Sequence, residues 1–283
     1  MKQVTTIAEL RAELTGQGAV GFVPTMGYLH EGHLSLMRRS RAADDVVVAS
    51  IFVNPLQFAA GEDLDAYPRD LDRDTALATE AGVDLLFVPD VTEMYPRPVL
   101  TSVSVDELAS VLEGATRPGH FTGVATVVAK LFSIVGPGRA YFGEKDFQQL
   151  QIVRRMASDL SLPVEVVGCP IVRESDGLAM SSRNVYLTAE ERRAAPVLRR
   201  ALTAGDYLVA RGETSPAAIA AAMTHVVTDE PLAELDYAAC VDPATLRPPD
   251  RVAPAMQLRL LVAARLGKPR LIDNIGASAP VSE

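Results

Sequence analysis

The chain has 283 residues, of which 48% are hydrophobic and 22% charged, a balance typical of globular proteins. Its formal net charge of -9 argues against non-specific binding to nucleic acids or to anionic membranes. The longest apolar runs, at residues 46–49 and 51–53, are too short to span a bilayer, and the first six residues lack the apolar core of a signal peptide. We therefore expect a cytoplasmic protein that binds neither nucleic acid nor a membrane.

The first part of the chain alternates predicted helices and strands. We expect helices over residues 7–14, 34–39, 70–81, 106–112, 124–135 and 147–159, and strands over 19–23, 45–53, 85–88, 101–105, 140–142 and 164–168. This alternation predicts a doubly wound parallel sheet of the α/β class. A GxGxxG spelling at residues 16–21 follows a helix and runs into a strand, the reverse of a dinucleotide fingerprint, so we interpret it as a turn.

The pattern changes near residue 172. A capping box at Thr188 begins an alanine-rich helix that we expect to reach about residue 210, and a second helix is expected over 215–228. Strands are predicted over residues 236–241, 257–264 and 270–272. The sequence therefore predicts two domains, 1–171 and 172–283, of which the second is a smaller α+β domain.

Two histidines three residues apart, His30 and His33, lie where a predicted strand turns into a helix. The first N–H groups of a helix are unpaired and its dipole is positive there, which favours an anion. Residues i and i+3 share a helix face, and Gly27 and Gly32 allow close approach of a ligand. The pattern favours a phosphate site. It does not fit a zinc hydrolase, because HExxH needs histidines four residues apart.

Polar residues follow two later predicted strands. Asn54 and Gln57 follow the strand over 45–53, where α/β sheets bind ligands; loop capping by Asn54 and an exposed Gln57 are the alternative. Lys145 follows the strand over 140–142 at a helix start, where a cation opposes the dipole unless an anion lies between them. A solvated lysine is the alternative there. A Walker A loop is not supported, because Glu144 separates Gly143 from Lys145.

Three further groups of residues carry weaker signals. Ser181, Ser182 and Arg183 can donate hydrogen bonds to a phosphate, although serines are common in loops. Five acidic residues lack a metal-ligand spacing, so we predict a solvated acidic face rather than a metal site: Asp63, Asp65, Asp70, Asp72 and Asp74. Cys169 and Cys240 lie in separate apolar runs, which favours buried free thiols over a disulfide.

His30-Glu31-Gly32-His33 resembles the HxGH signature of the nucleotidylyltransferase superfamily, and Met180-Ser181-Ser182-Arg183 resembles its partner phosphate loop. Four further blocks, residues 52–58, 117–121, 142–149 and 271–274, make the resemblance narrower. These blocks stand in the same order as in the pantoate–β-alanine ligase (pantothenate synthetase) family. The sequence resembles this family over essentially the whole chain.

The resemblance implies an enzyme that joins (R)-pantoate to β-alanine with ATP, through a pantoyl adenylate, and releases AMP and pyrophosphate. This reaction makes pantothenate on the route to coenzyme A. The resemblance further implies a Rossmann-like domain, 1–171, that binds ATP and pantoate, a lid domain, 172–283, and a homodimer. Mg²⁺ would enter bound to ATP, and no protein ligand of a metal is assigned.

The same resemblance implies roles for individual residues. His33 would be the proton donor. Gln57 would contact both pantoate and β-alanine, and Gln149 would contact pantoate. Asn54 is a further candidate substrate contact. Catalytic charge stabilisation would come from His30, His33, Lys145, Ser181, Ser182 and Arg183. The ATP contacts would be Met26, Gly27, Tyr28, Leu29, His30, Glu31, Gly32, His33, Gly143, Glu144, Lys145, Asp146, Val172, Met180, Ser181, Ser182 and Arg183.

Two alternatives stay open on the sequence. Another HxGH adenylyltransferase, acting on a phosphorylated acceptor, would need a basic pocket in place of the amide pair Gln57 and Gln149. The protein could instead be a non-catalytic adenine-nucleotide sensor. Such a sensor has no turnover, so His33→Ala would change nothing in a turnover assay.

Overall fold

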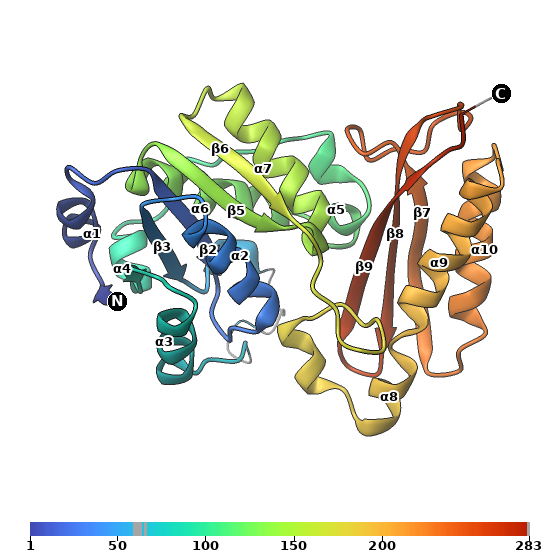
Figure 1. The fold of residues 1–283 in the computed structure, drawn as a ribbon, viewed down its shortest axis with the longest axis horizontal. Helices are drawn as coiled ribbons and strands as arrows, with labels where there is room; N and C mark the ends of the chain where they lie inside the picture. The colour runs from blue at the N-terminus through green and yellow to red at the C-terminus, as the bar shows by residue number, and fades with distance from the viewer. Residues whose placement is uncertain (59–63, 65–66, 282–283) are drawn as a thin grey trace. The chain divides into compact units, whose positions relative to one another are not determined.

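The computed structural model describes residues 1–58, 64 and 67–281, and its chain divides into two compact units, Met1–Pro170 and Ile171–Glu283 (Figure 1). Each unit has its own sheet and its own helices, so each is described by itself. None of the helices in these residues is long and apolar enough to cross a membrane.

The first unit is built on a six-stranded sheet with the order β1-β4-β3-β2-β5-β6. All of its paired strands are parallel. The strands are β1 (Lys2–Val4), β2 (Val20–Thr25), β3 (Val46–Ile51), β4 (Leu85–Phe87), β5 (Gly138–Gly143) and β6 (Val164–Cys169). From β2 the chain winds outward through β3 and β4 and then returns to place β5 on the other side of β2. This reversal is a topological switch point, where the carboxyl ends of α/β strands bind ligands.

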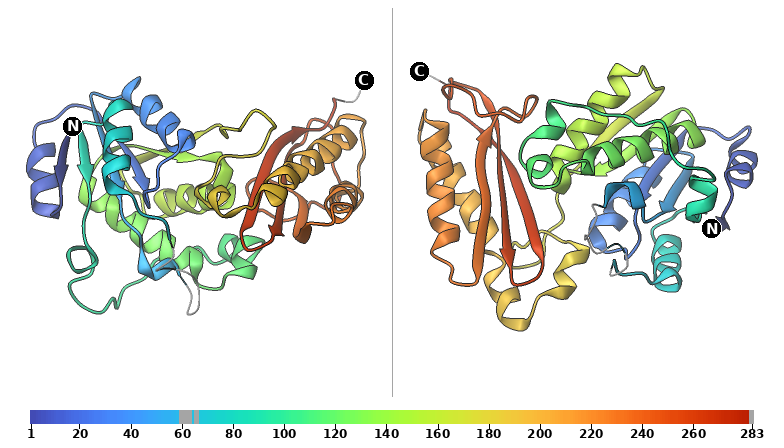
Figure 2. Two further views of the ribbon diagram at one scale, coloured as in Figure 1. Left: turned by 90° about the horizontal axis from the view of Figure 1, so that it is seen from below. Right: turned by 180° about the vertical axis from the view of Figure 1, so that it is seen from behind.

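Helices cover both faces of this sheet. The α-helices are α1 (Ile7–Leu14), α2 (Glu31–Arg41), α3 (Leu71–Glu80), α4 (Val91–Met94), α5 (Glu113–Thr116), α6 (His120–Val135) and α7 (Phe147–Asp159). Short 3-10 helices are η1 (Pro55–Gln57), η2 (Leu108–Ser110) and η3 (Glu144–Asp146). Helix α2 packs with α3, and α6 with α7; right-handed crossovers put these pairs on opposite faces (Figure 2). Buried apolar side chains such as Val23, Met37 and Leu86 fill the α2–α3 side.

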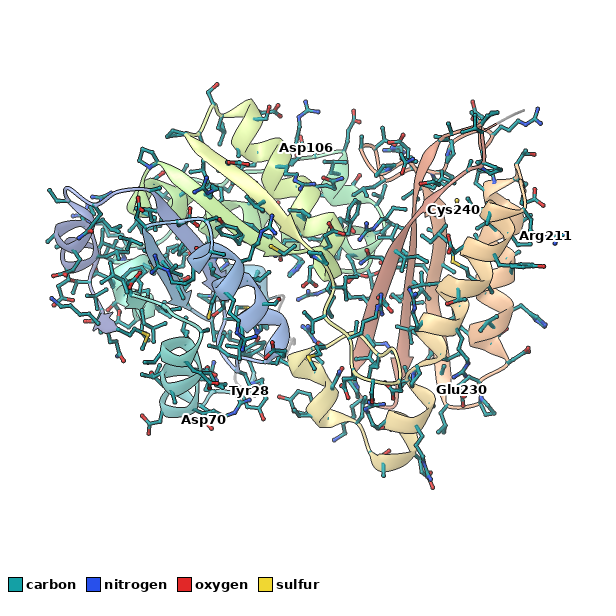
Figure 3. All side chains as sticks on the ribbon, viewed as in Figure 1. Tyr28, Asp70, Asp106, Arg211, Glu230 and Cys240 are labelled. Carbon is teal, nitrogen blue, oxygen red and sulfur yellow. The ribbon has the colours of Figure 1, made fainter. Side chains whose placement is uncertain are left out.

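The second unit has an antiparallel sheet with the order β7-β8-β9, formed by Ala233–Val241, Gln257–Leu266 and Arg270–Ser278. Its helices are η4 (Ser182–Tyr186), α8 (Ala189–Ala194), α9 (Val197–Ala210) and α10 (Pro216–Thr228). Helices α9 and α10 pack on the sheet, and residues such as Leu202, Met223 and Leu260 form the core between them (Figure 2). Cys240, labelled in Figure 3, belongs to this core.

The fold class is confirmed, because a parallel α/β sheet and a smaller antiparallel α+β unit are both present. Helices α1 and α7 have the predicted bounds. Both cysteines are free and buried, as predicted. The GxGxxG spelling follows α1, spans the turn after it and runs into β2, also as predicted.

Three predictions of secondary structure were wrong. Residues 101–105 form no strand, and the N–H of Val103 donates instead to the Thr126 hydroxyl at 3.0 Å. Only η2 forms within the helix expected over 106–112. The long helix expected from residue 189 divides into α8 and α9 around Pro196, which has no N–H to continue the ladder. Strand β1 was not predicted, and β9 extends to Ser278 because its pairing with β8 continues that far.

Candidate active site

The loop between β2 and α2 carries the histidine motif and is held by α3. Gly27 and Tyr28 both have left-handed backbones, with φ of 85° and 51°. The carboxylate of Asp74, on α3, accepts from the N–H groups of Tyr28 at 2.6 Å and Leu29 at 2.7 Å. The guanidinium of Arg73 lies 5.2 Å from the Tyr28 ring centre, and Figure 3 shows Tyr28 beside the start of α3. The first turn of α3 therefore fixes the course of the loop.

Asp74 corrects one prediction. It was expected on a solvated acidic face, but its exposed fraction is 1%, because it serves as an internal anion for two backbone N–H groups. Asp70 and Asp72 are exposed as predicted, and Asp70 caps α3 by accepting from the N–H of Arg73. Asp63 and Asp65 lie outside the described residues. The helical period carried a signal that was missed, because Leu77, Ala78 and Ala81 lie at i+3, i+4 and i+7 from Asp74.

The two histidine rings face each other with their centroids 4.1 Å apart, as the i, i+3 spacing predicts. His30 is the N-cap of α2, and its Nδ1 accepts from the N–H of Gly32 at 3.1 Å. The Nδ1 of His33 accepts from the N–H of His30 at 3.3 Å. An imidazole nitrogen that accepts carries no proton, so each neutral ring bears its proton on Nε2. The motif thus presents two neutral N–H donors.

Both imidazoles are uncharged at neutral pH. Burial, followed by the positive charge of Lys145, lowers the pKa of His30 to about 4. Burial is also the main cause that lowers the pKa of His33 well below its ordinary value, with smaller contributions from His30 and Lys145. Lys145 follows β5, so the structure brings it to the histidines at the switch point, where two N–H donors and a cation create a site suited to an anion.

Gln57 lies next to the histidine loop. It is 9% exposed, and its Nε2 donates to the Met26 sulfur at 3.0 Å while its Oε1 accepts from Asn54 Nδ2 at 3.2 Å. Its backbone oxygen lies 2.8 Å from His120 Nδ1 and accepts from Arg117 at 3.5 Å. The structure therefore excludes an exposed Gln57 and fixes both its backbone and its amide.

Asn54 has the capping role that the sequence left open. Its exposed fraction is 1%, and its Oδ1 accepts from the N–H of Leu56 at 3.3 Å at the start of η1. Its Oδ1 also accepts from the Tyr95 hydroxyl at 2.9 Å, and its Nδ2 donates to the oxygen of Gly123 at 3.1 Å as well as to Gln57. Its amide donors and its oxygen are all engaged within the protein, so Asn54 supports Gln57 in this structure. Tyr95 was missed from the sequence.

Two neighbouring glutamines on α7 have different surroundings. Gln148 is buried and connects α7 to the segment around η2, because its Nε2 donates to the oxygens of Leu108 and Val111 at 2.7 and 2.8 Å. Gln149 is half-buried and, within the described part of the chain, makes no hydrogen bond to Gln57. The structure thus does not join the amide pair directly.

In the second unit the structure brings Val172 to the predicted phosphate loop. The N–H of Met180 donates to the oxygen of Val172 at 3.0 Å, which closes a short antiparallel turn. Ser181 caps η4, because its hydroxyl oxygen accepts from the N–H of Arg183 at 3.3 Å. A hydroxyl that accepts can also donate its own proton, and Ser182 beside it is half-buried. Across the described residues, no cluster of three His, Cys, Asp or Glu side chains is arranged to hold a metal.

Comparisons with known proteins decide the family. The family model described as pantoate-beta-alanine ligase matches residues 2–276. The chain belongs to this family. It is 59% identical to the pantothenate synthetase of Sinorhizobium medicae (strain WSM419), with 97% of this chain and 95% of the relative covered. It is 58% identical to that of Roseiflexus sp. (strain RS-1), with coverage of 97% and 98%.

Solved structures of pantoate–β-alanine ligases share the fold. The crystal structure of pantothenate synthetase from Thermus thermophilus has a TM-score of 0.92 and 56% identity, covering 97% of this chain and 99% of that one. The ligase from Francisella tularensis, crystallised with beta-gamma ATP and β-alanine, has a TM-score of 0.80 and 33% identity, with 97% of each chain covered. These comparisons confirm the family and the fold expected from the sequence motifs.

Proposed function

We propose that this protein is an AMP-forming ligase that condenses (R)-pantoate with β-alanine to pantothenate, with pantoyl adenylate as intermediate. One observation carries the proposal. His30 and His33 present two Nε2–H donors near Lys145 at the switch point of the sheet, in a chain that belongs to this family. Such a group suits the polyphosphate of ATP, and a solved relative was crystallised with beta-gamma ATP and β-alanine.

In the first step the carboxylate of pantoate attacks the α-phosphorus of ATP. A carboxylate is ionised at neutral pH, so the attack needs no base. An oxygen–phosphorus bond forms, and the bond to pyrophosphate breaks. His30, His33 and Lys145 stabilise the charge that develops, and donors of this kind are each worth roughly 10²- to 10³-fold in rate. Ser181, Ser182 and Arg183 of the second unit supply further donors. Mg²⁺ enters with ATP as part of the substrate.

Gln57 orients pantoate in this proposal. Its Nε2 donates to the thioether of Met26, which is a weak acceptor, so an oxygen of pantoate can replace the sulfur at little cost. Asn54 and the hydrogen bonds to the Gln57 backbone keep the amide in place during that exchange. Gln149 supplies a second amide for pantoate. Met26–His33, Gly143–Asp146 and Val172 complete the proposed contacts to ATP.

In the second step the amine of β-alanine attacks the acyl carbon. A carbon–nitrogen bond forms, the carbon–oxygen bond to AMP breaks, and the amine loses a proton. The mixed anhydride must be shielded from water until then, and we assign that shielding to the second unit, residues 172–283, acting as a lid. We further propose that the protein is a cytoplasmic homodimer.

Pantoate-dependent exchange of labelled pyrophosphate into ATP, without β-alanine, tests the proposal. We expect exchange by the wild type, a loss of roughly 10²-fold or more in His33→Ala, and no loss in His225→Ala. His225 is a matched control, because it is an exposed histidine on α10. Formation of ADP, exchange that needs a phosphorylated acceptor, or ATP binding without turnover would each refute the ligase.

A further inference from the structure

Val172 and Met180, the first two nucleotide contacts proposed for the second unit, are the two ends of one β-hairpin. The N–H of Met180 donates to the oxygen of Val172, and Arg173 pairs with Ala179 in an antiparallel bridge. The N–H of Glu174 donates to the oxygen of Leu178 at 2.8 Å nearer the tip. The phosphate loop, Met180 to Arg183, therefore begins where this hairpin, residues 172–180, closes.

The residue after the phosphate loop is tied back to the hairpin. Asn184 donates through Nδ2 to the oxygen of Ala179 at 3.2 Å and to the carboxylate of Glu174 at 3.1 Å. Arg192 of α8 forms an ion pair with Glu174 at 2.6 Å and with Asp176 at 2.5 Å. The hairpin and the phosphate loop are thus bonded into one piece, and any shift of the hairpin shifts the loop.

A bidentate ion pair, together with a hydrogen bond from Arg173 to the oxygen of Asn274 at 3.4 Å, joins this piece to the sheet. Arg173 donates through Nη1 to Oδ2 of Asp273 at 2.7 Å and through Nη2 to Oδ1 at 2.9 Å. The same Nη1 donates to the oxygen of Gly177 across the hairpin at 2.9 Å. Asp273 lies on β9 and is 3% exposed. Two parallel hydrogen bonds fix the orientation of the guanidinium relative to the carboxylate as well as the distance between them.

The carboxylate of Asp273 is itself held in place. Its Oδ1 accepts from the N–H of Asn274 at 2.7 Å, and the Oδ1 of Asn274 accepts from Arg259 of β8 at 2.7 Å. Residues 271–274 are one of the blocks that carried the family resemblance, and no step of the proposed reaction uses them.

We propose that the Arg173–Asp273 pair is a positioning device that places the hairpin, and with it the ATP-binding loop, on the C-terminal sheet. The proposal rests on the assignment of Val172 and Met180 to Arg183 to ATP. Asp273 does not touch the nucleotide in this scheme; it acts through Arg173. Weakening the pair should therefore reduce the affinity for ATP more than the affinity for pantoate.

The test uses the full chain with Asp273→Asn, Arg173→Gln and the double variant. Asp236→Asn is a matched control, because Asp236 of β7 forms an ion pair with Arg270 of β9 at 2.6 Å on the same sheet. Binding of ATP, the KM values for ATP and pantoate in pyrophosphate exchange, and hydrogen exchange of the amides of residues 172–184 are measured. Arg173→Lys, which keeps the charge without the fork, serves if a neutral variant fails to fold.

Each single variant should raise the Kd and KM for ATP about tenfold or more, since a misplacement near 1 Å can cost on the order of 10²-fold. The pantoate KM should stay within about twofold, and amide exchange of the hairpin should accelerate. The double variant should resemble the worse single one, because it leaves no unpaired buried charge. Asp236→Asn should match the wild type in ATP affinity.

Unchanged ATP affinity and hairpin exchange in Asp273→Asn would overturn the inference, as would equal losses for ATP and pantoate or equal losses in the control. A wild type that binds ATP without pantoate-dependent exchange would refute only the ligase, because ATP binding and hairpin exchange still decide the role of Asp273. A wild type that does not bind ATP would overturn both.

Discussion

Replacing Asp74 by asparagine tests whether the histidine loop depends on a buried carboxylate. The ionised side chain accepts from the N–H groups of Tyr28 and Leu29 through separate oxygens. The asparagine side chain has nearly the same shape but offers one acceptor oxygen, and its NH₂ group faces the other N–H donor. One buried backbone donor therefore loses its partner, and the remaining hydrogen bond loses the assistance of the charge.

These two losses set the expected magnitude. A hydrogen bond to a charged group contributes roughly 1.5–3 kcal/mol, and a buried donor left unsatisfied costs roughly 1–3 kcal/mol. We expect Asp74→Asn to lower the free energy of unfolding by about 3 kcal/mol. Burial raises the pKa of Asp74 while its two N–H bonds oppose that rise, so part of the gain from these bonds offsets desolvation. Because Gly27 and Tyr28 are left-handed, the relaxed loop should also displace His30 and lower pyrophosphate exchange by roughly 10²-fold.

Urea unfolding and pyrophosphate exchange, measured on the same preparation, check both effects. Asp72→Asn is the control, because Asp72 is an exposed acid on the same first turn of α3. The reasoning fails if Asp74→Asn behaves like Asp72→Asn. It also fails if excess Mg²⁺ restores the activity of Asp74→Asn, since Asp74 would then serve the metal rather than the backbone.

Two further changes probe the surroundings of the site. In the unfolded chain His30 is protonated below about pH 6.5, but in the folded chain its pKa is lowered to about 4 and the ring stays neutral. The contribution of neutral His30 to the free energy of unfolding is therefore fully present above pH 6.5 and is lost as the pH falls towards 4. His30→Gln should remove up to about 3 kcal/mol of that pH dependence in urea unfolding between pH 7 and pH 4, and an unchanged slope would contradict the assignment. Tyr95→Phe removes the hydroxyl bonded to Asn54, so we expect about 1 kcal/mol less stability and a higher KM for pantoate with an unchanged KM for ATP; equal changes in both KM values would contradict a role beside Gln57.

Capping and periodicity, which act between residues close in sequence, predicted the helix bounds and the side-chain pair that depend on such residues. The bounds of α1 follow from its capping box and those of α7 from its periodicity, and the histidine pair follows from the i, i+3 spacing. The strand expected over 101–105 shows where such rules fail. Its alternating pattern is real, but Val103 finds a hydrogen-bond partner on α6 instead of a neighbouring strand.

The supports of the site could not be predicted, because they join residues distant in sequence. Asp74 meets Leu29 across 45 positions, and Arg173 meets Asp273 across 100. The helical period places Asp74 on the face of Leu77 and Ala78, but it does not identify the N–H groups that the carboxylate meets. The sequence motifs therefore identified residues proposed to meet substrate, whereas the residues that position them required the structure.

The histidine geometry bears on the role of proton donor that the family resemblance implied for His33. A neutral imidazole can give up its Nε2 proton only if Nδ1 gains one, and Nδ1 of His33 accepts from the N–H of His30. A proton there would set two donors against each other and disrupt the cap of α2. The negative charge of bound ATP would raise the pKa of the ring, but it would not supply Nδ1 with another acceptor. Adenylation by a carboxylate needs no proton, so a neutral Nε2–H that donates without transferring serves the first step and leaves the helix start intact.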